Sequence, residues 1–246
     1  LSIIIPAYNE AKRIRNTLHD YYHFFTQLKV RHVLDFELVV VLNGCADTTF
    51  EVVTHEQEHM PELIVLDLKE AGKGLAIAAG FKNALTRSND YIGFVDADMA
   101  TQPQYFYDLV RTLPAYDGVI ASRYMKGAHV SPPRPWIKRL GSIIFYQSLV
   151  RLLFGLWYKD LQCGAKVFKR HVTEVVAPQL TVRQWAFDVE LLYLCKRNKF
   201  VIKEIPTTWH DQADSKLRIM RSGMRMLSSL FYVRLHYSPL RGLVSS

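Results

Sequence analysis

Two carboxylates, Asp96 and Asp98, follow directly on the apolar run YIGFV at residues 91–95. Like charges at the end of a buried strand repel one another unless a cation or several hydrogen-bond donors satisfy them. Carboxylate oxygens suit Mg²⁺ or Mn²⁺, which usually keep their other coordination positions for water and substrate phosphates. We therefore expect Asp96 and Asp98 to hold a divalent metal, with Asp98 as the direct ligand and Asp96 on the metal's water or on the sugar of a nucleotide.

Basic residues after two other apolar runs are suited to binding phosphate. Lys73 lies in Gly72-Lys73-Gly74, where glycines at a helix start let backbone N–H groups approach a phosphate and the lysine adds charge. A simple turn with a solvated lysine is the alternative. Arg123 follows the run GVIAS at 118–122, a position from which its guanidinium can hold a phosphate through two hydrogen bonds. Further basic candidates are Arg134, Lys138 and Arg139.

The sequence His55-Glu56-Gln57-Glu58-His59 satisfies H-E-x-x-H, the helical zinc pattern of metalloproteases. That pattern requires a third protein ligand, and no convincing candidate follows it, because Met60-Pro61 ends the expected helix at once. In an α/β sheet this helix lies away from the edge where ligands bind. We therefore interpret these residues as a solvated helix face rather than as a catalytic zinc site.

The elements that position these residues are short β-branched runs alternating with longer amphipathic segments. The expected strands cover residues 1–5, 36–42, 62–68, 91–95 and 118–122, and the expected helices cover residues 10–28, 47–59, 73–86 and 104–112. This alternation predicts an α/β fold with a mainly parallel sheet and helices on both faces. Such sheets bind ligands at the carboxyl ends of their strands, where residues 6–10, 43–47 and 96–98 lie.

The composition is that of a globular protein with a basic surface. The 246 residues are 49% hydrophobic and 22% charged, which allows one large domain with a substantial core. The net charge of +8 favours an anionic partner such as a phosphate, a nucleic acid or a lipid surface. Three widely spaced cysteines, Cys45, Cys163 and Cys195, are typical of a reducing compartment and argue against a disulfide scaffold or a structural zinc site.

The second half of the chain is basic and partly amphipathic. Residues 118–173 contain ten Lys or Arg and a single acid, Asp160, together with an aromatic and aliphatic run at 143–157. After Asp214 there is no acid, and apolar residues recur at helical spacing from Leu217 to Phe231 beside a stripe of arginines. This pattern predicts C-terminal amphipathic helices that lie in a lipid headgroup layer.

Five segments resemble the family 2 glycosyltransferases with a GT-A fold: IPAYNE at 5–10, NGCADT at 43–48, GKGLA at 72–76, DAD at 96–98 and SRY at 122–124. The resemblance covers essentially the whole chain and implies a single GT-A domain, with a nucleotide-sugar half at 1–122 and an acceptor and membrane-interface half at 123–246. The second half most resembles the dolichyl-phosphate glucosyltransferases, through DLQCGAKVFKR at 160–170 and RQWAFDVELLY at 183–193. The dolichol-phosphate mannose synthases are the nearest relatives beyond them.

The resemblance implies a role for each matched residue. It implies that the nucleotide is bound at successive strand ends by Pro6, Tyr8, Glu10, Asn43, Asp47, Lys73 and Asp96. The metal is implied to lie on Asp96 and Asp98, and the phosphates on Arg123. Two departures stand out: the usual Asp-Asp-Gly-Ser loop reads Leu-Asn-Gly-Cys at 42–45, which leaves the choice between UDP and GDP less determined, and a metal-binding Gln of the mannose synthases is Ala100 here.

The implied reaction transfers glucose from UDP-glucose to a dolichyl or other polyprenyl monophosphate, with inversion at the anomeric carbon. A phosphate monoester has a second pKa of ~6, so the acceptor is largely dianionic at neutral pH and needs no general base. It needs cationic positioning, which we expect from Arg123 and Arg139, and an apolar groove for the lipid. Asp188 and Glu190 are expected to shape the site by pairing with basic residues.

Three alternatives stay open. Use of GDP-mannose would make the protein a polyprenyl-phosphate mannosyltransferase. A sugar hydroxyl as the acceptor would require a base, for which Asp188 is the leading candidate. The third alternative is a non-enzymatic basic protein that binds nucleic acid or an anionic membrane. Nucleic-acid binding would place stacking aromatics on a strand face, whereas the aromatics here lie on expected helices beside aliphatic residues. We therefore expect no nucleic-acid partner.

The expected location is the cytoplasmic face of a membrane, which is the endoplasmic reticulum in a eukaryote and the plasma membrane in a prokaryote. No stretch reaches the ~18 uninterrupted apolar residues that mark a membrane-spanning helix, and no signal peptide is visible. The sequence begins without Met on the strand-like run LSIII. We expect either a peripheral protein or one that is anchored by a segment outside these residues.

Overall fold

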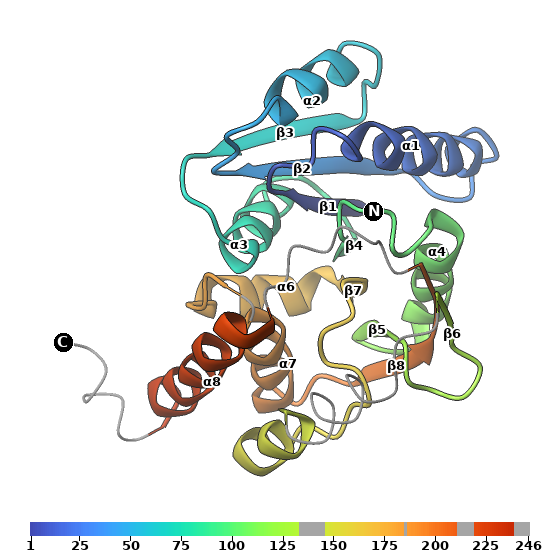
Figure 1. Ribbon diagram of the computed structural model, residues 1–246. Helices are drawn as coiled ribbons and strands as arrows, with labels where there is room; N and C mark the ends of the chain where they lie inside the picture. Colours follow the sequence, from blue (N-terminus) through green and yellow to red (C-terminus); the bar gives the residue numbers. More distant parts are fainter. Residues whose placement is uncertain (133–145, 185, 211–218, 239–246) are drawn as a thin grey trace.

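The computed structural model of the protein describes residues 1–132, 146–184, 186–210 and 219–238, with the backbone alone for 219–226 (Figure 1). Its centre is a seven-stranded sheet in the order β3-β2-β1-β4-β7-β5-β8. The strands are β1 (Ser2–Ala7), β2 (Glu37–Asn43), β3 (Leu63–Leu68), β4 (Tyr91–Phe94), β5 (Gly118–Ser122), β7 (Lys166–Lys169) and β8 (Ile202–Pro206). A separate two-stranded sheet pairs β6 (His129–Ser131) with β9 (Thr208–His210).

Helices cover both faces of the large sheet (Figure 1). They are α1 (Ile14–Val30), α2 (Thr49–Gln57), α3 (Lys73–Ala84), α4 (Pro103–Thr112), α6 (Arg170–Val176), α7 (Phe187–Arg197) and α8 (Ile219–His236), with short 3₁₀ turns at Leu113–Ala115 and Ala177–Gln179. Residues 146–154 form a further helical segment. The predicted α/β fold is therefore confirmed, as are all five expected strands and four expected helices.

Alternating side chains of β1 show how the sheet builds two cores. Ile3 and Ile5 pack in one hydrophobic cluster with residues of α1, α2 and α4. Ile4 packs in the other, with residues of α3, α6, α7 and α8. Because successive side chains of a strand point to opposite faces, a strand covered on both sides is apolar throughout, which is why LSIII lacks polar alternation.

Strand β7 was missing from the sequence prediction. It runs antiparallel between β4 and β5, whereas β1, β2, β3 and β4 pair in parallel, as do β5 and β8. Its four residues, KVFK, are too short and too basic to produce a strand pattern. The insertion of β7 joins strands of the second half of the chain to those of the first half in one sheet.

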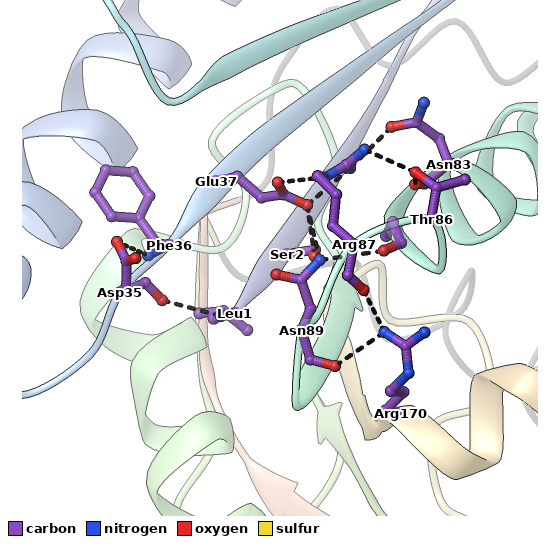
Figure 2. Close-up of polar contacts among 11 residues, drawn as sticks. Leu1, Ser2, Asp35, Phe36, Glu37, Asn83, Thr86, Arg87, Asn89 and Arg170 are labelled. Carbon is purple, nitrogen blue, oxygen red and sulfur yellow. Dashed lines mark hydrogen bonds and ion pairs between the residues drawn. The ribbon is translucent and has the colours of Figure 1, made fainter.

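A polar cluster holds together the edge of the sheet where β1 and β2 begin (Figure 2). Glu37 accepts hydrogen bonds from Arg87 Nε at 2.7 Å and Nη2 at 2.8 Å, and from Ser2 Oγ at 2.7 Å. Arg170 donates to the carbonyl oxygen of Arg87 and, at 2.9 Å, to that of Leu85. A little-exposed carboxylate requires such partners, so this cluster ties β2, the end of α3 and α6 together on the side opposite the strand ends that carry the site.

Two further expectations concern the cysteines and the membrane. The three cysteines are unpaired thiols, in agreement with the argument against a disulfide scaffold, and Cys163 and Cys195 are buried. Among the helices of the described residues, none is both long and apolar enough to span a bilayer.

Candidate active site

Loops after β1, β2 and β4 meet at the carboxyl edge of the sheet. The side-chain oxygen of Asn9 accepts a hydrogen bond from the backbone N–H of Ala46 at 2.7 Å, which joins the first two loops. Thr17 Oγ1 of α1 donates to the carbonyl oxygen of Ala97 at 2.7 Å, which joins α1 to the third loop. Asn9 and Met99 have φ angles of 55° and 60°, in the left-handed region that ordinary side chains rarely adopt. Such strain persists where the surrounding contacts over-determine the backbone, and it is common at functional sites.

Asp96, the first carboxylate after β4, is bound by Lys73. The Nζ atom of Lys73 lies 2.5 Å from Asp96 Oδ1, and the two side chains are only 17% and 24% exposed. Burial lowers the pKa of Lys73, but the carboxylates of Asp96, Asp188 and Asp98 outweigh it, so the net shift is upward and the lysine stays charged. The structure thus brings the predicted residues Lys73 and Asp96 into direct contact.

Among the residues that the structure describes, no Lys or Arg forms an ion pair with Asp98, the second carboxylate. Its Oδ1 accepts a hydrogen bond from the backbone N–H of Ala100 at 3.1 Å. Burial and the neighbouring charge of Asp96 raise the pKa of Asp98 from 3.8 to about 6, although Arg13 and Lys73 act in the opposite direction. A carboxylate that is costly to ionise beside a second carboxylate fits a divalent cation, which would relieve both charges through hard oxygen ligands. The donor set of Asp96 and Asp98 therefore fits Mg²⁺ or Mn²⁺.

Gly164 is a site residue that sequence reasoning did not single out. An added Cβ at this position would stand 1.8 Å from Asp96 Oδ2 and 2.2 Å from its Cγ. Only glycine lets the backbone of residues 163–165 pass so close to the carboxylate. The signal was present in the segment DLQCGAKVFKR, but the reason for its glycine is visible only once β7 is placed beside β4.

Lys166 is a second residue that sequence reasoning missed, and it is fully buried on β7. Its Nζ atom lies 2.5 Å from Asp188 Oδ1 and donates to the carbonyl oxygen of Cys163 at 2.7 Å. Its ammonium also lies 5.3 Å from the centre of the Phe94 ring. Asp188, at the start of α7, thus pairs with a basic residue as expected. The same lysine fixes the turn that carries Gly164 against Asp96.

Glu190, the other acid of α7, binds loop and C-terminal groups instead of water. Its carboxylate accepts hydrogen bonds from the backbone N–H groups of Thr181 at 3.0 Å and Val182 at 2.8 Å. The hydroxyl of Tyr237, just after α8, donates to it at 2.9 Å. Glu190 therefore shapes the framework that supports the site through these neutral donors, and within the described part of the chain it has no ion pair of the expected kind with a basic residue.

Residues at the end of β1 and after it lie at the carboxyl edge of the sheet. Pro6 is buried within β1, whereas Tyr8 is 46% exposed. Glu10 Oε2 accepts from Arg13 Nε at 2.8 Å and Nη2 at 2.6 Å, and Arg13 is in turn a cation that acts on Asp98. Of these three predicted nucleotide residues, Tyr8 offers the most accessible surface for a base to pack against.

The two predicted residues after β2 are tied to the backbone. Asn43 is 3% exposed, donates to the carbonyl oxygen of Ala7 at 2.8 Å and accepts from the N–H of Gly72 at 3.1 Å. Asp47 is exposed and accepts hydrogen bonds from the hydroxyl of Thr49 and, at 3.0 Å, from its backbone N–H. Asn43 thus links the ends of β1 and β2 to the start of α3 from within, and Asp47 lies on the surface of the loop after β2.

The interpretation of Gly72-Lys73-Gly74 as an open phosphate cradle is wrong. The N–H groups of Gly74 and Leu75, at the start of α3, donate to the carbonyl oxygen of Arg183 at 3.0 and 3.3 Å. An added Cβ on Gly74 would stand 2.3 Å from the carbonyl oxygen of Val182. These glycines admit the 182–183 backbone, which occupies the helix start that a phosphate would need. Lys73 remains in the site through its contact with Asp96.

Arg123 follows β5 as predicted, and it is held by a buried partner. Its Nε and Nη2 donate to the two oxygens of Asp160 at 2.7 and 2.9 Å, and the side chains are 9% and 2% exposed. Burial alone would raise the pKa of Asp160, but Arg123 outweighs it and holds that pKa below its usual range. The guanidinium also stacks 4.9 Å from the Trp209 ring centre. The Nη1 group of Arg123 takes no part in these two hydrogen bonds to Asp160, so a phosphate would have to contact the guanidinium through Nη1.

A small pocket adjoins Arg123. Its lining residues are Arg123, Tyr124, Tyr146, Gln147, Asp160, Leu161 and Gln162. Burial and the charge of Asp188 raise the pKa of Tyr146, one of these lining residues. The predicted residue Arg139 lies outside the described residues, as do Arg134 and Lys138.

Glu56, the residue that would serve as general base if the H-E-x-x-H sequence were a protease site, is turned away from the two histidines. Glu56 is 5% exposed, and its two oxygens lie 2.8 Å from Arg15 Nε and 2.8 Å from His19 Nε2 of α1. It therefore points into the protein, whereas His55 and His59 are exposed.

Comparison with known proteins gives a family and several similar structures. Residues 2–176 match the family described as Glycosyl transferase family 2. The chain is 30% identical to a dolichyl-phosphate beta-glucosyltransferase of Trichomonas vaginalis, over 96% of this chain and 71% of that protein. It is 31% identical to the dolichyl-phosphate beta-glucosyltransferase of Saccharomyces cerevisiae, over 96% of this chain and 75% of that protein.

Solved structures share the fold at low sequence identity. Glucosyl-3-phosphoglycerate synthase from Mycobacterium tuberculosis, solved with Mn²⁺, UDP-glucose and phosphoglyceric acid, has a TM-score of 0.66 and 17% identity, over 95% of this chain and 78% of that chain. Mannosyl-3-phosphoglycerate synthase from Rubrobacter xylanophilus has a TM-score of 0.67 and 17% identity, over 98% and 74%. At this identity the likeness concerns the fold alone.

Proposed function

Because the chain belongs to glycosyl transferase family 2, we propose that it transfers glucose from UDP-glucose to the phosphate of a dolichyl or other polyprenyl monophosphate. An oxygen of the acceptor phosphate attacks the anomeric carbon of glucose, and the bond from that carbon to the UDP oxygen breaks. UDP departs with the bonding electron pair, and the new bond forms on the opposite face of the sugar. The products are UDP and a glucosyl phosphoryl lipid with inverted configuration.

Residues of the first half of the chain are suited to binding the nucleotide-sugar donor. Asp96 and Asp98 would hold a Mg²⁺ or Mn²⁺ ion, which supplies positive charge for the departing diphosphate. Lys73, buried against Asp96, adds a fixed cation beside the same position. Tyr8 offers an exposed ring for the base, and Glu10, Asn43 and Asp47 support the loops around it. These roles together define the nucleotide half of the proposed site, residues 1–122.

The observation that carries this proposal is the ion pair between Asp188 and Lys166. A hydroxyl acceptor would need a base, and Asp188 is the leading candidate for one, but its carboxylate is held 2.5 Å from a fully buried ammonium. A base must hydrogen-bond to the proton that it abstracts, whereas Oδ1 of this carboxylate is already engaged by Lys166. A phosphate acceptor arrives already ionised and needs positioning alone, for which Arg123 and Arg139 are the proposed cations.

Replacing Asp188 with Asn separates the two acceptor classes. The amide oxygen of Asn can still accept the hydrogen bond of Lys166, but the buried ammonium then has no counter-charge, so the circular dichroism spectrum and melting temperature of the variant are checked before its rate is compared. Loss of a general base costs about 10²–10⁴ in rate. If Asp188 is not a base, transfer to polyprenyl phosphate stays within about tenfold of the unchanged protein, and its pH profile still follows the acceptor's ionisation near ~6. A loss of a hundredfold or more with normal donor binding would count against the phosphate acceptor.

The donor is tested with the same assay. UDP-glucose, GDP-mannose, UDP-GlcNAc and UDP-glucuronate are offered in turn with polyprenyl phosphate and Mn²⁺. Transfer from UDP-glucose alone is expected. Transfer from GDP-mannose alone would replace the sugar while leaving the reaction class intact.

A lipid acceptor requires a contact with a membrane, and we propose peripheral association on its cytoplasmic face. Leu152, within the helical segment 146–154, is 82% exposed, and Trp157, just after it, is 76% exposed. Arg151 lies 5.6 Å from the Trp157 ring centre, and Phe231 on α8 is 51% exposed. Exposed apolar and aromatic side chains next to arginines suit the headgroup layer. These residues belong to the half of the chain, 123–246, that we assign to the acceptor.

A further inference from the structure

The C-terminal end of α2 carries a cluster of potential metal ligands outside the site described above. His55, Glu58 and His59 each offer one ligand atom, and these three atoms lie within 4.8 Å of one another. Among the residues that the structure describes, this is the only group of three or more such side chains so close together. Figure 1 shows α2 beside the edge strand β3, away from α7 and α8.

The geometry of the cluster suits chelation of one ion. The rings of His55 and His59 lie with centroids 5.5 Å apart at an interplanar angle of 75°, and Glu58 Oε2 lies 3.8 Å from His55 Nδ1. Ligands of a tetrahedral zinc ion at its usual bond length of about 2 Å stand about 3.3 Å from one another. The His55 and Glu58 side chains are 57% and 72% exposed, so rotation about their side-chain bonds can close the remaining gap without moving the core.

The helix end adds a second favourable element. The N–H groups of Glu58 and His59 donate to the carbonyl oxygens of His55 and Glu56 at 3.3 and 3.0 Å, which closes the last turn of α2. The C-terminal end of a helix carries partial negative charge, which stabilises a cation. The three ligands project from this turn into solvent, where an incoming ion meets no barrier.

The ligand types select the class of metal. Two imidazoles and one carboxylate suit Zn²⁺, Cu²⁺, Ni²⁺ or Co²⁺, whereas Mg²⁺ and Mn²⁺ prefer oxygen ligands such as Asp96 and Asp98. Glu56, the acid of the H-E-x-x-H pattern, is turned into α1 and cannot activate a water on this ion. A metal here would be bound without hydrolytic chemistry.

We infer that His55, Glu58 and His59 form a surface site for one ion of the zinc class. The bound ion crosslinks the C-terminal end of α2, and the site is independent of Asp96 and Asp98. Its open positions are filled by water. This site does not depend on the proposed transferase activity, so either conclusion can fail without the other.

The test is calorimetric titration of tag-free, EDTA-treated protein with Zn²⁺. One ion per chain is expected in the unchanged protein. His55→Gln and His59→Gln should each weaken binding by about tenfold or more, because each removes one of only three protein ligands. His23→Gln is the matched control, since His23 is an exposed histidine of α1 that contacts Gln27 and not the cluster.

A second variant separates the two metal sites. Asp98→Asn removes a carboxylate of the active site and should leave zinc binding unchanged. Cu²⁺ in place of Zn²⁺ should give an electron paramagnetic resonance spectrum with coupling to two imidazole nitrogens, and His59→Gln should reduce that coupling to a single imidazole nitrogen. Absence of binding, binding that survives both histidine replacements, or binding abolished by Asp98→Asn would each overturn the inference.

Discussion

Replacing Asp98 with Asn should make the metal-free protein more stable while it abolishes metal-dependent transfer. The carboxylate of Asp98 is half-buried beside Asp96, and burial is the largest cause of its raised pKa. An Asn side chain has no charge to bury, and its amide oxygen can still accept the hydrogen bond of the Ala100 N–H. The substitution therefore removes a destabilising charge and keeps the local backbone contact.

The magnitude follows from the pKa shift. The pKa of Asp98 rises from 3.8 to about 6, and each unit corresponds to about 1.4 kcal/mol, which gives an upper limit of about 3 kcal/mol. Solvent screening of this half-buried group reduces the expected gain to about 1–2 kcal/mol. For a chain of this size each kcal/mol moves the melting temperature by about 2–4 °C, so the expected rise is about 2–8 °C.

The sign of the pH dependence is fixed by the direction of the shift. Between the unfolded pKa of 3.8 and the folded pKa of about 6, the folded protein binds the Asp98 proton more tightly than the unfolded chain does. Stability from this group therefore falls as the pH rises through that window and stays low above it. The advantage of Asp98→Asn should be full at pH 7.5 and nearly absent at pH 4.

The assay is thermal denaturation of the two proteins in EDTA at pH 7.5 and pH 4, followed by a titration with Mn²⁺ at pH 7.5. Mn²⁺ should raise the melting temperature of the unchanged protein and should have little effect on Asp98→Asn. A less stable Asp98→Asn protein in EDTA at pH 7.5, or a difference of the same size at both pH values, would refute the reasoning.

Two other substitutions test contacts on which the fold and the site depend. Gly164→Ala should displace the Asp96 carboxylate and lower the rate of transfer by about tenfold or more, because even a small misplacement of a catalytic group is costly. A circular dichroism spectrum like that of the unchanged protein would show that the fold is intact. Arg87→Ala should lower the free energy of unfolding, measured by urea denaturation, by about 1–3 kcal/mol, because it leaves the Glu37 carboxylate short of donors. Arg111→Ala should lower it by less than about 0.5 kcal/mol, because the side chains of Arg111 and its partner Asp108 are 67% and 53% exposed. Equal costs for the two arginines would show that the Glu37 cluster contributes little.

The carboxyl edge of the sheet could be predicted because its determinants are local. Five apolar runs predicted five strands to within a few residues, and in a parallel sheet the residues that follow each strand lie at one edge. Asp96, Asp98 and Lys73 were therefore expected in one place, and the structure joins Lys73 to Asp96 directly.

The contacts that were missed are those between distant parts of the chain. The partner of Arg123 is Asp160, 37 positions away, and the partner of Asp188 is Lys166, 22 positions away. The glycines around Lys73 resemble a phosphate loop until the backbone of Arg183 is placed on them. No periodicity or turn pattern encodes such pairings, since they join segments that are distant in the sequence and meet only in the folded chain.

The central claim, transfer of glucose to a lipid phosphate without a general base, is tested most directly by the product itself. Purified protein is incubated with UDP-glucose, Mn²⁺ and either a polyprenyl phosphate or the corresponding polyprenol, and the lipid product is analysed by nuclear magnetic resonance at the anomeric carbon. We predict a β-linked glucosyl phosphoryl lipid from the phosphate and no product from the alcohol. Transfer to the alcohol, or an α-linked product from the phosphate, would contradict the account.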